Sequence, residues 1–289
     1  MPSFDTPEPI SVTVELGVGD IWIAASDRSD TVVDVRPSDS AKKADVAAAQ
    51  QTRVEYANGR LLIKAPKRRR QYTFRGGGES IVVQIDLPAG SQVRGEAGVA
   101  TFHCTGRLGE CRLRTGVGEI HVDQAGAVDL RTGFGDITID RAAGQADITT
   151  GSGALQIGVI DGTAVVKNSN GDTGIGAVTG DLRVNAANGK IVVDQAEAAV
   201  AAKTANGDVR LGEVAGGAVL AETALGKIEV GIRDGVTAWL DLNTSFGTVH
   251  SDLDDTGRPE AGQDAVEVRA RTAMGDITIR RVPAARATR

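Results

Sequence analysis

The chain has few aromatic residues and few cysteines. Aromatic residues make up 3% of the 289 residues, which is little for an ordinary enzyme core and leaves small and β-branched residues to fill the interior. The two cysteines, Cys104 and Cys111, are too few for a disulfide framework. With 41% hydrophobic residues the chain can still bury a core, so its composition argues against disorder.

Targeting and membrane signals are also missing from the sequence. The stretch from Met1 to Asp5 has neither the basic start nor the apolar segment of a signal peptide. No run approaches the roughly 18 apolar residues of a transmembrane helix. The net charge of −6 gives no overall case for nucleic-acid binding. We therefore predict a cytoplasmic protein.

Glycine, in contrast, is abundant, with 37 residues, and it returns about every 18 residues along most of the chain. It usually stands in a short phrase in which a charged residue and then an aliphatic residue follow the glycine. A fixed period of this kind indicates a repeat architecture. The repeat glycines are Gly118, Gly135, Gly153, Gly171, Gly189, Gly207, Gly226, Gly247 and Gly275.

Apolar residues occupy fixed places relative to each repeat glycine. Around Gly189, for example, Leu182 and Val184 precede the glycine at alternate positions, and Ile191 and Val193 follow it in the same way. Alternation with period two predicts a short strand with one buried face, so each repeat contains two strands. The strict spacing favours a solenoid over a hairpin meander, because equivalent residues then stack at about 4.8 Å. We therefore predict an all-β, parallel β-helix-like solenoid with two-strand rungs of about 18 residues.

The period extends upstream of the repeat glycines. Ala100 takes the place of a repeat glycine, and Val83 with Ile85 matches the inward rows of the rung before it. Further back, the segments from Gly17 to Ile23 and from Asn58 to Ile63 repeat the glycine phrase.

The region between those two segments favours a helix. Residues 41–51 are rich in Ala, Lys and Gln, which predicts a short helix that caps the first end of the solenoid. We predict an N-terminal rung and capping region over residues 1–82 and solenoid repeats over residues 83–289, in one continuous domain. The tail after Ile279 is expected to protect the other end of the solenoid.

Three asparagines fill one place on successive rungs. Asparagine tolerates the left-handed conformation that a tight turn needs, and stacked amides can bond to one another along the solenoid axis. We predict a structural ladder of Asn170, Asn188 and Asn206, with a polar binding strip as the alternative. Charges of alternating sign occupy the place after the glycine and predict ion pairs between neighbouring rungs: Asp172, Lys190, Asp208 and Lys227.

A threonine stands three places before most repeat glycines. A flat exposed threonine row would suggest ice binding. Alternation instead places this row inward or at the corner of the rung, where hydroxyls can bond to the backbone. The row consists of Thr115, Thr132, Thr150, Thr204, Thr223, Thr244 and Thr272.

The cysteines and two of the histidines are the candidate metal ligands. Cys104 and Cys111 fall in inward rows of one rung at a spacing that does not suit zinc, so we predict buried free thiols, with a disulfide as the alternative. His103 and His121 stand on adjacent rungs in an outward row and could share a metal ion. The alternative is an ordinary surface pair. Because no third ligand accompanies them, we predict no metal site and no cofactor.

Stacked carboxylates raise the possibility of an enzyme, because acid–base catalysis on polysaccharides needs two carboxylates in one groove. The candidates are Asp123, Asp129, Asp140 and Asp147. We expect interleaved arginines to neutralise them, namely Arg112, Arg114, Arg131 and Arg141. The sequence also lacks a phosphate loop, a nucleophile elbow and a zinc-protease motif. We therefore predict that the chain is not an enzyme.

Two segments interrupt the repeat. Residues 64–78 form a basic loop with interleaved aromatic residues, which can bind phosphate backbones or anionic lipid headgroups. A solvated loop is the alternative. Its candidate binding residues are Lys67, Arg68, Arg69, Arg70, Tyr72 and Arg75. The segment between Ser251 and Val266 is acidic, and we interpret it as an exposed loop rather than a calcium site.

The phrases Gly116-Val117-Gly118-Glu119-Ile120 and Gly133-Phe134-Gly135-Asp136-Ile137 resemble a bacterial β-strand-repeat family. This family is labelled "putative adhesin" and is also called the toastrack domain. The resemblance covers roughly Ile10 to Arg280, and the Ala/Gly/Arg-rich composition is similar to the stand-alone actinobacterial members. Members are often joined to membrane segments of envelope-stress systems, so the resemblance implies an assembly platform. The family assigns no catalytic residues.

We therefore predict a non-catalytic β-repeat scaffold or protein-interaction domain with a role related to envelope stress. The alternatives are a carbohydrate-active β-helix enzyme and a binder of anionic lipid or nucleic acid through the basic loop. The expected partner is a protein, and the chain is expected to be a monomer or an end-to-end dimer.

Overall fold

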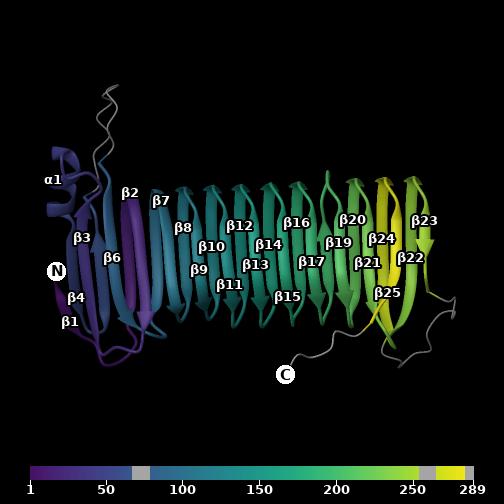
Figure 1. Ribbon diagram of the computed structural model, residues 1–289, viewed down its shortest axis with the longest axis horizontal. Coiled ribbons are helices and arrows are strands. Elements are labelled where there is room, and N and C mark those ends of the chain that lie inside the picture. The colour runs from purple at the N-terminus through teal and green to yellow at the C-terminus, as the bar shows by residue number, and fades with distance from the viewer. Residues whose placement is uncertain (67–78, 254–264, 284–289) are drawn as a thin grey trace. The chain divides into compact units, whose positions relative to one another are not determined.

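The computed structural model describes residues 1–66, 79–253 and 265–283, which are mostly β-strand (Figure 1). One short helix, α1 (Lys43–Gln51), occurs in this described part. The chain divides into two compact units, Met1–Ala143 and Gly144–Arg289, and each is a β-solenoid. The predicted all-β solenoid with a short helix near its N-terminus is confirmed. The domain limits expected from the sequence stay a prediction.

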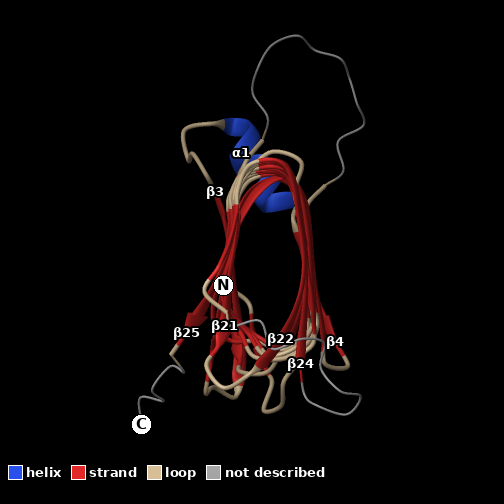
Figure 2. Cartoon of the chain, turned by 90° about the vertical axis from the view of Figure 1, so that its right-hand side faces the viewer, coloured by secondary structure: helices blue, strands red, loops and turns tan. Residues whose placement is uncertain are grey.

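In the second unit the two strands of each rung belong to two layers. In spatial order the first layer contains β12 (Ala146–Ser152), β14 (Ala164–Asn170), β16 (Leu182–Asn188), β18 (Val200–Lys203), β20 (Ala218–Leu225), β24 (Ala265–Met274) and β22 (Thr237–Phe246). The second layer contains β13 (Leu155–Ile160), β15 (Thr173–Val178), β17 (Ile191–Ala196), β19 (Val209–Val214), β21 (Ile228–Arg233), β25 (Ile277–Val282) and β23 (Val249–Ser251). All these pairings are parallel, and Figure 2 shows β21 with β25 facing β22 with β24.

The space between the two layers is filled by the predicted inward rows. On the rung of β16 and β17, the side chains of Leu182, Val184, Ile191 and Val193 are at most 2% exposed. Each of them stacks on the same position of the next rung, as Val184 does on Val166. Burying an aliphatic side chain of this kind stabilises a fold by about 1.5–3 kcal/mol. The repeated rows therefore build one continuous core within the unit.

The first unit is also built of two layers, and two long strands run through both of its layers. These are β2 (Ser11–Ser26) and β7 (Gln92–Arg107). The first layer also contains β4 (Arg53–Ala57), β5 (Arg60–Lys64), β8 (Cys111–Val117) and β10 (Val128–Phe134). The second also contains β1 (Ser3–Asp5), β3 (Asp30–Pro37), β6 (Ile81–Pro88), β9 (Ile120–Ala125) and β11 (Ile137–Ala142).

The turn between the layers requires glycine. Gly171 has a φ of 131°, and a Cβ at this position would lie 2.1 Å from the carbonyl oxygen of Gly153 on the neighbouring rung. A side chain would therefore be both strained and blocked. The expectation that asparagine adopts the left-handed conformation at this turn is wrong, because among the described non-glycine residues only Asn58 has a positive φ.

Asn58 belongs to a different kind of turn. With Gly59 it forms the two-residue connection between the antiparallel strands β4 and β5, and both residues have positive φ, 53° and 72°. This is the conformation of a type I′ hairpin, which Asn-Gly favours. We expect the segment from Asn58 to Ile63 to repeat the glycine phrase of the solenoid. That expectation is wrong for Asn58 and Gly59, which form a hairpin turn and not a turn between layers.

Antiparallel strands and α1 lie at the first end of this unit. β4 pairs with β5, and β3 pairs with both β1 and β6, each antiparallel. The helix packs against β3 and β6 (Figure 1). The buried carboxylate of Asp45 anchors it by accepting hydrogen bonds from the backbone N–H groups of Ser80, at 3.1 Å, and Asp39, at 3.2 Å. The predicted helix in the capping region is thus confirmed.

The rungs of the first unit do not follow sequence order. β2 lies between β6 and β7, so Gly19 stands beside Ala100 on one side and beside Ile81 on the other. Val83 and Ile85 are buried as predicted, but their rung is not the one next to Ala100. The reason is that β2 continues the same inward pattern and offers both of its edges for parallel pairing.

The last rungs of the second unit are also out of order. β24 and β25 pair with β20 and β21 on one side and with β22 and β23 on the other. The last rung in space therefore consists of β22 and β23. Part of the tail that we expect to protect this end, Arg280 to Val282, lies within β25, and the tail from residue 284 onward falls outside the described residues.

Candidate functional site

The basic loop proposed from the sequence falls outside the described residues. This applies to Lys67, Arg68, Arg69, Arg70, Tyr72 and Arg75. The acidic segment from residue 254 to residue 264 also falls outside them. Binding through either segment stays a prediction.

The two cysteines are buried, free thiols, as predicted. The hydrogen bond between the Cys104 and Cys111 side chains, together with burial, raises the pKa of Cys104 well above its usual value. Because the thiolate is the reactive and metal-binding form, this pair is suited to packing rather than to chemistry.

The two histidines lie side by side on an outward face of the first unit. His103 pairs in register with His121 and stacks on the ring of Trp22, at a centroid distance of 3.9 Å and an interplanar angle of 16°. His121 Nε2 lies 3.4 Å from Asp123 Oδ1. Within the described ranges, no group of three His, Cys, Asp or Glu residues could hold a metal ion. Metal binding by the pair therefore stays a hypothesis.

The carboxylate of Asp129 is surrounded by arginines, as expected of a neutralised ladder. Its oxygens lie 2.7 Å from Arg131 Nε, 3.0 Å from Arg114 Nη2 and 3.7 Å from Arg112 Nε. Burial raises the pKa of Asp129, but hydrogen bonds from Arg131 and Arg114 outweigh it, and the pKa is lowered. A carboxylate held in its charged form is a poor general acid.

The polar rows next to the repeat glycines serve the backbone and one another. Asn188 Nδ2 donates to Asn170 Oδ1, and Asn206 Nδ2 donates to Asn188 Oδ1, each at 2.8 Å. In the threonine row, Thr132 and Thr223 donate to glycine carbonyls at 3.0 and 2.9 Å. The predicted asparagine ladder and the corner position of the threonines are therefore confirmed.

An exposed apolar row, which sequence reasoning missed, follows the turns of the first unit. It consists of Val18, Val99, Val117 and Phe134, which pair with one another in register across neighbouring strands. We call it the apolar ridge. Val99 and Val117 are each 46% exposed and Phe134 is 63% exposed. The signal was available in the sequence, because each of these residues stands immediately before the glycine position.

The charged residues beside the ridge are acidic. Asp20 and Glu119 stand one place after the glycine position, and both are exposed. The ridge thus combines a continuous apolar line with carboxylates along one side.

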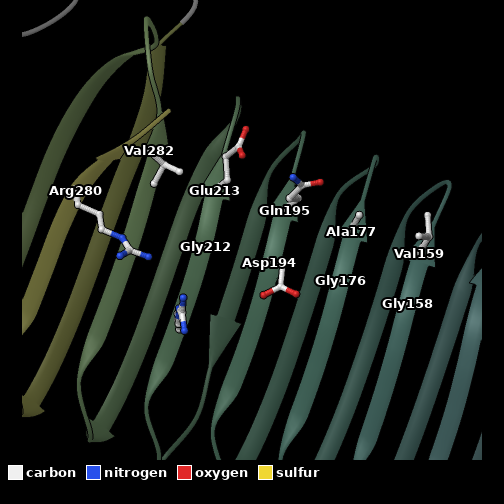
Figure 3. A pocket seen from close by; sticks show the side chains of 11 residues that line it. Gly158, Val159, Gly176, Ala177, Asp194, Gln195, Gly212, Glu213, Arg280 and Val282 are labelled. Carbon is white, nitrogen blue, oxygen red and sulfur yellow. The ribbon is translucent and has the colours of Figure 1, made fainter. Parts of the chain in front are cut away.

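A shallow groove of about 580 Å³ runs across the second layer of the second unit (Figure 3). Its lining includes Gly158, Gly176 and Gly212, which stand at the same place on β13, β15 and β19. A Cβ at Gly176 would lie 2.5 Å from the carbonyl oxygen of Gly158, and one at Gly212 would lie 2.6 Å from that of Asp194. At these glycines the floor is bare backbone, because a side chain there would meet the carbonyl oxygen of the neighbouring rung.

Charged side chains stand at one end and in the middle of this groove. Arg210 and Arg280 line it, and Arg280 extends from β25 toward Gly212 in Figure 3. The Nε of Arg280 is buried and has no hydrogen-bond partner in the described part of the chain. Asp194 lies among the glycines. The remaining acid, Glu213, is 5% exposed and is paired with Arg233.

The signal for the groove was also present in the sequence. Glycines occupy outward places of strands, where alternation predicts polar side chains. Glycine in a repeat protein usually indicates a turn, so the sequence alone does not distinguish these strand glycines from turn glycines. Arg280 was assigned to the tail rather than to a strand, so its place beside the glycines could not be seen.

No helix among the described residues is long and apolar enough to cross a membrane. A search of curated proteins found no match. Among solved structures, the chain is similar to a "putative cell adhesion protein" from Clostridium sporogenes, with 13% identity, a TM-score of 0.25 and coverage of 97% of this chain and 98% of the other. It is also similar to a "putative adhesin" from Bacteroides fragilis, with 12% identity, a TM-score of 0.34 and coverage of 97% and 95%.

The family assignment rests on the sequence match and not on these distant structural likenesses. The Toastrack DUF4097 family matches residues 9–280, which is nearly the whole chain. The glycine phrases from which the resemblance was inferred lie within this range. The chain therefore belongs to the Toastrack DUF4097 family.

Proposed function

We propose that the chain is a non-catalytic, protein-binding scaffold and that its apolar ridge is a contact surface for the partner. The observation that carries the proposal is the continuous exposure of Val99, Val117 and Phe134 on adjacent strands. Soluble proteins rarely leave contiguous apolar rows in water unless the rows are covered by a partner. A rigid stack of rungs also presents such a row with little entropy to lose on binding.

The charged form of the stacked carboxylate Asp129 favours a scaffold over a carbohydrate-active enzyme. Catalysis at a glycosidic bond needs one carboxyl group that stays protonated near neutral pH. Asp129 is instead held charged by arginines. The role in envelope stress and the cytoplasmic location remain parts of this proposal.

The contact surface can be tested by photo-crosslinking in host cells. A photoreactive amino acid in place of Val117 is expected to give one dominant protein adduct. Adding Phe134→Asp should reduce that adduct about tenfold, because a charge in the middle of an apolar interface is costly. The stability of Phe134→Asp should stay within about 0.5 kcal/mol of wild type, since the side chain is exposed.

The matched control is Trp22→Asp. Trp22 is 46% exposed, as Val117 is, and it lies on the same unit, but it does not belong to the ridge. This substitution should leave the adduct unchanged. An adduct that survives Phe134→Asp, or that is lost equally in Trp22→Asp, would contradict the proposal. Turnover of a glycan by the purified chain would favour the enzyme instead.

A further inference from the structure

Arg280 has a buried donor without an acceptor. Its Nε is out of contact with water and makes no hydrogen bond to any residue that the structure describes. An unmade hydrogen bond of this kind is costly in a folded protein and calls for an explanation. The side chain extends over the glycine positions toward Gly212, into the groove. It lies beside Gly231, its register partner on β21, which has no side chain of its own.

Among the described residues, no carboxylate pairs with the Nε of Arg280 at this end of the groove. Glu213 lies nearby, but it forms an ion pair with Arg233, which also pairs with Glu197. Arg210 is the second cation of the lining. It stands on β19, two strands from Arg280, and its register partner on β21 is Glu229. Strands in a sheet are about 4.8 Å apart, so two arginine side chains can converge above Gly212 and Gly231. Guanidinium groups arranged in this way suit a carboxylate, which they can bind in a bidentate manner.

The shape of the groove suits an extended polypeptide. It crosses six neighbouring strands from β13 to β25, which is about 24 Å at the usual strand spacing. An extended chain rises about 3.3 Å per residue, so about seven residues fit. The bare backbone of the floor leaves room for a narrow chain, and Val159, Ala177 and Val282 add small apolar surfaces.

The lining favours a peptide over a sugar or a nucleic acid. None of the described residues that line the groove is aromatic, so there is no ring face on which a sugar or a base could stack. The carboxylate of Asp194 lies one strand from Arg210 and would repel a uniformly anionic polymer. It would accept hydrogen bonds from the N–H groups of a peptide.

We propose that this groove binds an extended polypeptide segment through an acidic side chain, which is held between Arg210 and Arg280 above Gly212. The apolar ridge belongs to the other unit. The groove proposal is therefore independent of the proposed contact surface, and either can fail without the other.

The test uses two capped serine–alanine heptapeptides, one with a central glutamate and one with a central glutamine. Binding to the full chain is followed by amide chemical shifts of Gly158, Gly176 and Gly212. We expect the glutamate peptide to bind at least tenfold more tightly than the glutamine peptide. Arg280→Gln and Arg210→Gln should each remove that difference, and added salt should weaken the binding.

Arg183→Gln is the matched control, because it removes the same charge from the first layer of the same unit, outside the groove lining. It should not change the affinity. Thermal unfolding should show Arg280→Gln to be folded, since the substitution breaks no hydrogen bond of the described structure. Equal binding of the two peptides, or equal losses in Arg183→Gln and Arg280→Gln, would overturn the proposal. Tighter, Arg280-dependent binding of a galacturonate trimer would overturn its polypeptide part.

Discussion

Individual polar residues at the turns act as links between rungs. Asn188 both donates to Asn170 and accepts from Asn206, so one amide group serves two neighbours. Asp172 makes two contacts to a single neighbour, because its Oδ1 accepts the backbone N–H of Lys190 while Oδ2 lies 3.7 Å from the Lys190 ammonium. These contacts are exposed and individually weak. Their value is that a rung shifted by one residue would lose all of them together.

We expect Asn188→Asp to lower the free energy of unfolding by about 0.5–1.5 kcal/mol. The carboxylate has the shape of the amide but cannot donate to Asn170 Oδ1, so two acceptors would face each other. Urea unfolding measures the change. Gln156→Glu is the control, because it makes the same chemical change at an exposed position of the same unit. A loss of the same size in Gln156→Glu would show that added negative charge, and not the ladder, is responsible.

At the scale of the rung, the glycine turn is the element that sets the spacing. The neighbouring backbones approach so closely there that the carbonyl of one rung fills the place of a Cβ on the next. This explains why glycine recurs at this place on successive rungs.

We expect Gly171→Ala to destabilise the fold by about 3 kcal/mol or more, because it combines a forbidden φ with a backbone clash. Gly174→Ala, three residues away on the same rung, is the comparison. The atom nearest to a Cβ at Gly174 would be the side-chain oxygen of Gln156, at 3.3 Å, and that side chain can move, while the nearest backbone atom would be 3.8 Å away. Its effect should stay below about 1 kcal/mol in thermal or urea unfolding. Similar losses in both variants would contradict the turn argument.

The rungs themselves were predictable, whereas their order was not. Rows such as Leu182 and Val184 report burial directly, because a buried face tolerates only apolar residues. The order of rungs depends on which edge pairs with which, and both edges of a rung present the same backbone groups. Gly19 and Val83 therefore look equivalent in sequence, although β2 stands between β6 and β7. The ridge and the groove escaped notice for a related reason, since their residues also fit the repeat pattern.

At the scale of a whole unit, stability should vary along the solenoid. In the second unit the last rung, β22 and β23, pairs on one side with β24 and β25, and no pairing of its other side occurs within the described residues. Leu240 and Leu242 are half-buried and Val249 is 47% exposed, although their counterparts Val268, Ala270 and Ile277 are fully buried. The core is thus exposed at this rung.

Hydrogen exchange should follow this gradient. Amides of β22 and β23 are expected to exchange well before those of β14 to β17, because local opening of a repeat protein begins where a rung has one neighbour. Peptide-resolved mass spectrometry would measure the order. Protection of β22 equal to that of β16 would mean that something covers the last rung, and an end-to-end dimer detected by light scattering would then account for it.

The position of β25 between two other strands has a mechanical consequence. Parallel partners hold it on both sides, β21 along one edge and β23 along the other. Force applied to the chain beyond Pro283 would load both ladders in shear, so that many hydrogen bonds resist together. An ATP-driven protease that pulls from this side would meet its main resistance at the first strand it engages. A solenoid with rungs in simple sequence order would instead release its outermost strand first, one bond at a time.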